Sequence, residues 1–267
     1  MTAIAASLVK ELRDQTGAGM MDCKRALTET NGDLEAAVRL LREWGAASAA
    51  KRAGRETPEG KVGYRIADDS SRGTMVAVGC ETEPVSNNDE FLAFAKNVLE
   101  VVETDGPGAE AGLEDDRLAI SGKLGENIVV VGAARFEAVD GGAIYAYAHP
   151  PANKIGVIVH VREGSPDLGR KLAMHIAASQ PQWVGRDDVP DELVTAEREI
   201  YLSSDEVQSK PEQARERIVE GMLNKRFFAA QVLSDQVWIH DTTMGVGDVL
   251  EEEGAEVLEF ERFALGA

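Results

Sequence analysis

Cysteine is scarce in this sequence. The 267 residues contain two, Cys23 and Cys80, which lie far apart and match no metal-binding spacing. This excludes a disulfide framework and a cysteine-based metal cluster. It predicts free thiols in a reducing cytosol.

Basic residues and long apolar runs are also few. The chain has 28 Lys and Arg against 47 Asp and Glu, so its acidic surface repels phosphate backbones and direct nucleic-acid binding is not expected. The apolar runs are too short to cross a bilayer. The N-terminus lacks the basic region and apolar core of an export signal. We expect a soluble, cytoplasmic protein without a membrane partner.

Motifs of catalysis and cofactor binding are missing as well. The sequence has no Gly-x-Ser-x-Gly nucleophile turn and no glycine fingerprint between a strand and a helix. The segment from Gly54 to Lys61 fails as a phosphate-binding loop, because five residues separate its glycines and Val62 follows the lysine. We therefore expect a binding protein rather than an enzyme, with no cofactor. Four histidines show no metal-ligand spacing: His149, His160, His175 and His240.

Residues 1–45 have the pattern of a small bundle of three short helices. Apolar residues recur at helical spacing from Ile4 to Leu12. Asp33 follows a turn and is a good N-cap for the third helix. Residues 46–60 are rich in Ala, Gly and basic residues, and we expect a helix tail that runs into a linker.

An internal repeat with a spacing of about 80 residues follows the linker. Each copy reads as a strand, a polar turn, a second strand and a helix that can cover the sheet. The sequence therefore predicts an α+β fold with two subdomains, residues 61–140 and 141–267, each an antiparallel sheet with helices. The expected strands are 62–66, 75–78, 143–147 and 155–159, with edge strands at 128–131 and 133–139, a late strand at 255–263, and helices at 91–102, near 172–176 and at 246–252.

Residues 191–233 are predicted to form a helical hairpin. Leu193, Ala196 and Ile200 make an apolar stripe on its first arm, and Pro211 ends the turn at a helix start. Such a hairpin either packs on its own domain or projects as an antiparallel coiled coil.

The segment from Thr16 to Leu27 carries the strongest functional signal. Gly17 and Gly19 form a sharp turn, and a helix begins directly behind them with Met20 and Met21. Flexible apolar side chains beside a glycine turn are typical of a protein-docking surface. The alternative is that the methionines face a small core, and we expect this of one of the two.

This segment and the helix before it closely resemble the N-terminus of bacterial elongation factor Ts. The resemblance runs almost unbroken from Ser7 to Leu27 and continues in weaker patches to the C-terminus. It implies a module like a ubiquitin-associated domain and a guanine nucleotide exchange factor for elongation factor Tu, working in a heterodimer or higher-order complex with that GTPase. The residues expected to anchor this end on the GTPase domain are Leu12, Gly17, Gly19, Met20 and Met21. Many relatives have a further C-terminal helix, whose contacts we expect to be absent because the sequence ends at Ala267.

The second candidate is the segment from Cys80 to Phe91. On its own it reads as a strand-to-helix loop, with Asn88 or Asp89 capping the helix. The family usually has Thr-Asp-Phe-Val here, and the acid and the aromatic ring wedge into the GTPase, loosen its magnesium and phosphate-binding loop, and release GDP. The resemblance assigns this role to Thr82, Glu83, Pro84 and Val85.

Glu83 and Pro84 depart from the family's acid and aromatic pair. Glu83 keeps the charge on a longer side chain, and Pro84 keeps a rigid apolar tip without the ring. A fully buried Phe contributes about 1.5–3 kcal/mol, and at about 1.4 kcal/mol per tenfold the wedge is expected to be weaker by about tenfold or more. We expect exchange activity to be retained.

His149 is the third candidate, at a hairpin tip stiffened by Pro150 and Pro151. The resemblance implies contact with the partner's C-terminal barrel domain, with Lys154 in place of the usual Arg. The alternative is an ordinary exposed turn histidine.

Two rival functions remain: a relative that binds the GTPase without exchange activity, and an adaptor whose helical module binds another protein.

Overall fold

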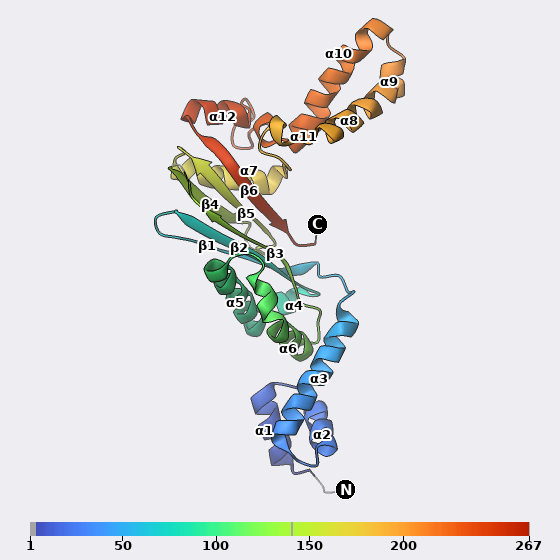
Figure 1. Cartoon of the computed structure of the whole chain (residues 1–267), viewed down its shortest axis with the longest axis vertical. Coiled ribbons are helices and arrows are strands. Elements are labelled where there is room, and N and C mark those ends of the chain that lie inside the picture. The colour runs from blue at the N-terminus through green and yellow to red at the C-terminus, as the bar shows by residue number, and fades with distance from the viewer. Residues whose placement is uncertain (1–3, 140, 267) are drawn as a thin grey trace.

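The computed structural model describes residues 4–139 and 141–266. The protein is elongated, with a helical module at the N-terminal end, a body of two stacked sheets in the middle and a helical hairpin at the far end (Figure 1). In the described residues, no helix is both long enough and apolar enough to cross a membrane.

The N-terminal module consists of α1 (Ala6–Thr16), α2 (Met20–Glu29) and α3 (Leu34–Arg52). The side chain of Asp33 accepts a hydrogen bond from the Ala36 amide at 2.9 Å, which caps α3 as the sequence predicts. Helix α3 runs seven residues beyond position 45, so the predicted helix tail extends to Arg52. The module encloses a small core: Val9, Leu12, Cys23, Ala26, Leu27 and Ala37.

The strands of the described chain form two antiparallel sheets with the orders β1–β2–β3 and β4–β5–β6. The middle strands are covered on both sides, which explains their nearly continuous apolar sequences. The predicted α+β fold with repeated subdomains is therefore confirmed. The strands are β1 (Glu59–Ile66), β2 (Arg72–Cys80), β3 (Val129–Glu137), β4 (Gly142–Ala148), β5 (Ile155–Arg162) and β6 (Glu256–Ala264).

One strand prediction was wrong. Residues 128–139 were expected to hold two edge strands, but β3 runs through Gly132 as one strand along β2. The ring of Phe263 fills the space beside this glycine, where a Cβ would lie 2.4 Å from the ring. The small residue therefore permits contact between the sheets rather than a chain break.

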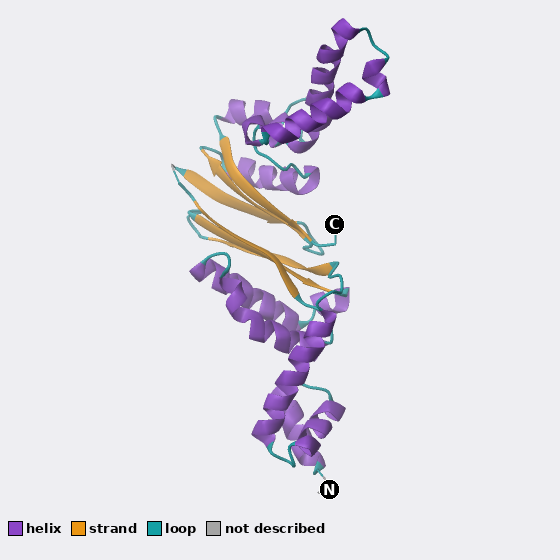
Figure 2. Cartoon of the chain, turned by 45° about the vertical axis from the view of Figure 1, so that its right-hand side comes forward, coloured by secondary structure: helices purple, strands orange, loops and turns teal. Residues whose placement is uncertain are grey.

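The two sheets pack face to face, with helices on their outer sides (Figure 2). The outer face of the first sheet carries α5 (Asp89–Asp105) and α6 (Glu114–Leu124). The second carries α7 (Pro166–Ser179) and α12 (Val246–Glu253). The layer between the sheets is apolar: Val62, Met75, Ala77, Ala134, Ile144, Ile158 and Leu265.

The hairpin projects from the second subdomain (Figure 1). Its arms are α8 (Asp191–Ser203) and α10 (Glu212–Met222), joined through α9 (Asp205–Gln208), and a π-helix (Leu223–Phe228) and α11 (Ala229–Gln231) lead back to the body. The stripe of Leu193, Ala196 and Ile200 is exposed. The packed face of α8 is the neighbouring one, with Val194, Tyr201 and Leu202 against the hairpin core.

Candidate partner-binding site

The first candidate surface is the turn between α1 and α2. Gly17 ends α1 at φ +67°, a left-handed conformation that favours glycine, and its N–H donates to the Arg13 carbonyl at 2.7 Å. Met20 is 56% exposed and Met21 is 73% exposed. The expectation that one of them faces the core was wrong, because neither methionine belongs to the core cluster, against which Ala18 of the turn packs instead. Both side chains therefore lie on the surface.

Leu12 lies beneath this surface rather than on it. Its side chain is fully buried in the module core, so direct contact with a partner requires a different residue. The physical reason is the small size of the bundle, which needs each apolar position of α1 that faces inward. Leu12 supports the turn from inside.

The second candidate surface is the loop between β2 and α5. It contains the single turn α4 (Glu83–Ser86), in which Pro84 occupies an early position that needs no N–H donor. Val85 packs on the core of the first subdomain, whereas Glu83 and Pro84 are exposed. Asn88 caps α5 by accepting a hydrogen bond from the Glu90 amide at 2.9 Å. The loop thus presents an acid and a rigid apolar ring on an anchored base.

Lys123 of α6 connects these two surfaces. Its ammonium group lies 2.7 Å from a carboxylate oxygen of Glu90, directly after the loop. Its side chain also covers Gly17, where a Cβ would lie 2.1 Å from the Lys123 Cε atom. The glycine turn and the loop are therefore neighbours on one face of the protein.

A close helix crossing holds the module on the body. A Cβ on Gly122 of α6 would lie 3.1 Å from the Cα atom of Gly45 in α3, so the two backbones approach each other at these glycines. The Arg52 guanidinium donates to the Ser121 carbonyl at 3.4 Å on the same side. These contacts fix the direction in which the module extends.

The third candidate, His149, lies at the same end of the sandwich. It is exposed, and its Nδ1 atom lies 2.7 Å from the hydroxyl of Tyr147. The tip is tied to β1, because the Val62 amide donates to the Asn153 carbonyl at 2.7 Å. Since the first residue of β1 pairs with Cys80, the tip and the loop flank the same strand end.

Lys154 has a partner within the chain. Its ammonium group lies 3.0 Å from a carboxylate oxygen of Glu59 at the start of β1. Both side chains are partly buried, so this ion pair holds the base of the tip.

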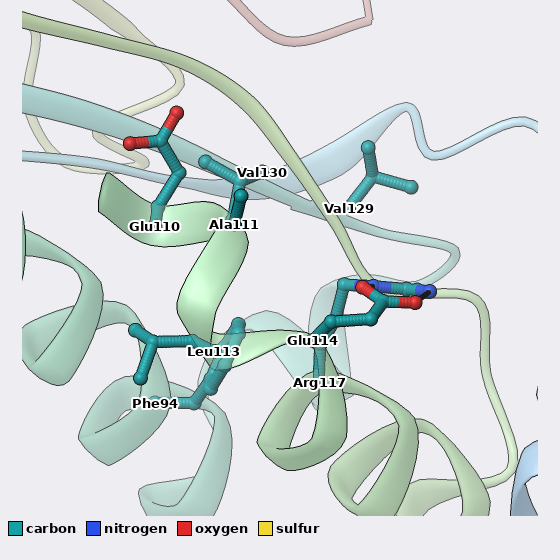
Figure 3. Close-up of a pocket in the computed structure, with 8 residues that line it drawn as sticks. All are labelled: Phe94, Glu110, Ala111, Leu113, Glu114, Arg117, Val129 and Val130. Atoms are coloured by element: carbon teal, nitrogen blue, oxygen red, sulfur yellow. Dashed lines mark hydrogen bonds and ion pairs between the residues drawn. The ribbon is translucent and has the colours of Figure 1, made fainter. Parts of the chain in front are cut away.

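A pocket of about 220 Å³ lies on the first subdomain, between β3 and the 3-10 helix Ala109–Leu113. Figure 3 shows Arg117 and Glu114 side by side at its mouth. The guanidinium of Arg117 donates to both carboxylate oxygens of Glu114, at 2.7 and 2.6 Å, and to the Ile128 carbonyl at 2.7 Å. This arginine is therefore occupied in holding the chain just before β3.

The two thiols carry no chemistry at these surfaces. Burial raises the pKa of the Cys80 thiol to about 12, and the nearby Glu126 carboxylate adds to the effect. Burial also raises the pKa of Cys23. Both side chains are therefore protonated and shielded near neutral pH. Within residues 4–139 and 141–266, no group of three or more His, Cys, Asp or Glu side chains is arranged to hold a metal ion.

Comparison with known proteins agrees with this architecture. Residues 81–267 match the family described as "Elongation factor TS". The chain belongs to the elongation factor Ts family. It is 42% identical to Elongation factor Ts of Thioalkalivibrio sulfidiphilus over 273 residues, covering 98% of this chain and 92% of that protein. It is 40% identical to the Hahella chejuensis protein, covering 100% and 93%, and 42% identical to the Shewanella amazonensis protein, covering 99% and 91%.

Membership in the elongation factor Ts family identifies the chain as a translation elongation factor.

Sequence reasoning missed two features of the protein surface. No sequence pattern marks Lys123, because the residues that it contacts, Gly17 and Glu90, are far away in the sequence. Val237 and Ile239 are 60% and 40% exposed on either side of the buried Trp238. Their alternation with a buried aromatic residue is a strand-like pattern that the sequence does contain.

Proposed function

We propose that this chain binds elongation factor Tu in its GDP-bound form and promotes the release of GDP, so that GTP can enter. The supporting observation is that Glu83 and Pro84 are exposed on an anchored turn, while Met20 and Met21 are exposed beside the glycine turn that Lys123 joins to the end of the same loop. Guanine nucleotide exchange on elongation factor Tu is the role of the family to which the chain belongs.

Exchange of this kind needs no covalent chemistry. A factor that binds the nucleotide-free GTPase more tightly than the GDP-bound form lowers the affinity for GDP by the same ratio. In this proposal, different residues provide binding to the partner and the effect on its nucleotide site. The methionines and His149 provide binding at separate points, while Glu83 brings a negative charge toward the magnesium and phosphate site.

The partner complex is a heterodimer or a higher-order complex of this chain with elongation factor Tu, acting in the cytoplasm. The large net charge of −19 is consistent with a protein partner rather than with direct contact to nucleic acid. Light scattering coupled to gel filtration of the mixed proteins measures the stoichiometry.

The proposal is tested by GDP release from the cognate elongation factor Tu, followed with fluorescent GDP in a stopped-flow instrument. We expect this chain to accelerate release strongly, and Glu83→Ala to lower the maximal rate with a smaller effect on the half-saturating concentration. Glu110→Ala is the matched control, because Glu110 is a half-buried glutamate of the same subdomain that lies outside the loop.

Pro84 favours a second candidate function, a relative that binds the GTPase without releasing its nucleotide. Proline has no aromatic ring, and the wedge is weaker by the missing apolar area. Binding measured by calorimetry without faster GDP release identifies this alternative. Absence of both binding and acceleration contradicts each reading and leaves the adaptor hypothesis.

A further inference from the structure

The start of the loop between β2 and α5 is held by a carboxylate from a distant part of the chain. One oxygen of Glu126 accepts hydrogen bonds from the backbone N–H groups of Glu81 and Thr82, each at 3.0 Å. The other oxygen accepts from the Thr82 hydroxyl at 2.5 Å. These three bonds fix the residue directly before the exposed pair Glu83 and Pro84.

The interaction is reciprocal. The carboxylate of Glu81 contacts the segment that carries Glu126: one of its oxygens accepts a hydrogen bond from the backbone N–H of Asn127 at 2.7 Å. Arg55 lies 3.2 Å from the second oxygen of Glu81 and accepts at its carbonyl from the Asn127 side chain at 2.9 Å. The two chain segments are thus joined in both directions.

The segment that carries Glu126 is itself immobilised. The Ser121 hydroxyl donates to the Glu126 carbonyl at 2.6 Å, and Arg117 donates to the Ile128 carbonyl at 2.7 Å. Asn127 and Ile128 are buried. Because its support is rigid, the Glu126 carboxylate can impose a fixed position on Thr82.

We propose that Glu126 is a positioning residue for nucleotide exchange: it holds Thr82 so that Glu83 and Pro84 are presented to the partner in one geometry. This inference rests on the proposed function. A two-residue tip without an aromatic ring gains little from burial, so its effect depends on how firmly it is held before contact.

Replacement of Glu126 separates this role from a general effect of charge. In Glu126→Gln, the amide oxygen can accept from both backbone N–H groups and the amide N–H can donate to the Thr82 hydroxyl oxygen, so the contacts survive without the charge. Glu126→Ala removes all three. Ordering Thr82 anew at each encounter lowers the maximal rate of GDP release by about tenfold in the alanine variant.

The experiment measures maximal rate and half-saturating concentration for wild type, Glu126→Ala and Glu126→Gln, with Glu110→Ala as control. Glu110 also accepts a backbone N–H, from Gly108 at 2.7 Å, but lies outside the loop. We expect a rate loss in Glu126→Ala with little change in half-saturation or melting temperature, and recovery to within about threefold in Glu126→Gln. A wild-type rate in Glu126→Ala overturns the inference, as does equal loss in both variants.

Amide hydrogen exchange in the free protein distinguishes failure of this inference from failure of the proposed function. We expect the Thr82 amide to exchange faster in Glu126→Ala than in wild type, whether or not the chain releases GDP from its partner. Equal exchange at this amide in the two proteins overturns the positioning role. Absence of GDP release by wild type, with the difference in exchange intact, overturns the proposed function alone.

Discussion

Substitution of Gly122 tests whether the helical module and the loop act as one rigid surface. The Cβ of any larger residue would lie 3.1 Å from the Cα atom of Gly45, closer than ordinary van der Waals contact. The remaining carbons of a leucine have no room between backbones at this distance. In Gly122→Leu, α3 must move away from α6, and the contacts of Lys123 and Arg52 across the junction are lost.

The size of the effect follows from those contacts. Holding a long side chain in place costs about 0.5–1.5 kcal/mol. Two such side chains, Lys123 and Arg52, must be ordered again when the displaced module docks on the partner. The sum of about 1–3 kcal/mol corresponds to a rise of about 5- to 150-fold in the half-saturating concentration for GDP release.

The matched control is Gly221→Leu in α10, where a Cβ would meet no atom within 4 Å. Both variants are measured by stopped-flow GDP release, and circular dichroism melting verifies that they are folded. We expect the control to behave as wild type. An unchanged half-saturating concentration in Gly122→Leu refutes the claim that the junction aligns the two surfaces.

Three further outcomes are expected. Pro84→Phe restores apolar area to the tip of the loop and raises the maximal rate of GDP release by up to about tenfold, whereas an unchanged rate means that the ring has no pocket on this partner. Gly169→Ala in α7 lowers the free energy of unfolding by about 1–2 kcal/mol, because crowding outweighs the gain in helix propensity; its Cβ would lie 2.1 Å from the ring of Tyr145. In contrast, Gly221→Ala raises the free energy of unfolding by about 0.5–1 kcal/mol, measured by urea denaturation. A change of the same sign in both variants contradicts the packing argument. The free energy of unfolding falls as the pH drops below about 6.5, because burial lowers the pKa of His175 and the unfolded chain binds the proton first; a fall of the same size in His175→Phe assigns it to other groups.

The local elements of the fold were predictable from the sequence because they depend on short-range patterns. The cap at Asp33, the helix after Asn88 and the apolar runs of β2 and β5 each lie within a few residues of the signal that predicts them. The pairing of the last strand was not predictable in this way. Strand β6 pairs with β5, which lies nearly a hundred residues earlier in the chain. The alternation of buried and exposed residues in β6 indicates a strand but does not indicate which strand it pairs with.

In the candidate site, too, the features that depend on local sequence were predictable and those that depend on distant contacts were not. The exposure of Glu83 and Pro84 follows from their place in a tight turn, whereas the burial of Leu12 depends on how three helices close around one core. The role of Glu126 was outside the reach of sequence patterns, because its partners precede it by 44 and 45 residues. A glutamate in an acidic chain has no distinguishing mark until its hydrogen bonds are known.

These contacts bear on how a loop without an aromatic ring can act on a partner. An aromatic ring adds affinity through the apolar area that it buries on contact with the partner. A turn that is already rigid in the free protein adds affinity because no conformational entropy is lost in ordering it on binding. Pro84 fixes its own backbone angle, Val85 is anchored in the core, and Glu126 fixes Thr82 from the other side. Rigidity before contact is therefore the property by which this loop can offset its smaller apolar tip. It follows that loosening the loop should harm exchange more in this chain than in a Pro84→Phe variant. The double variant Glu126→Ala with Pro84→Phe measures this, since independent contributions would leave the fold-loss from Glu126→Ala unchanged in the Phe background.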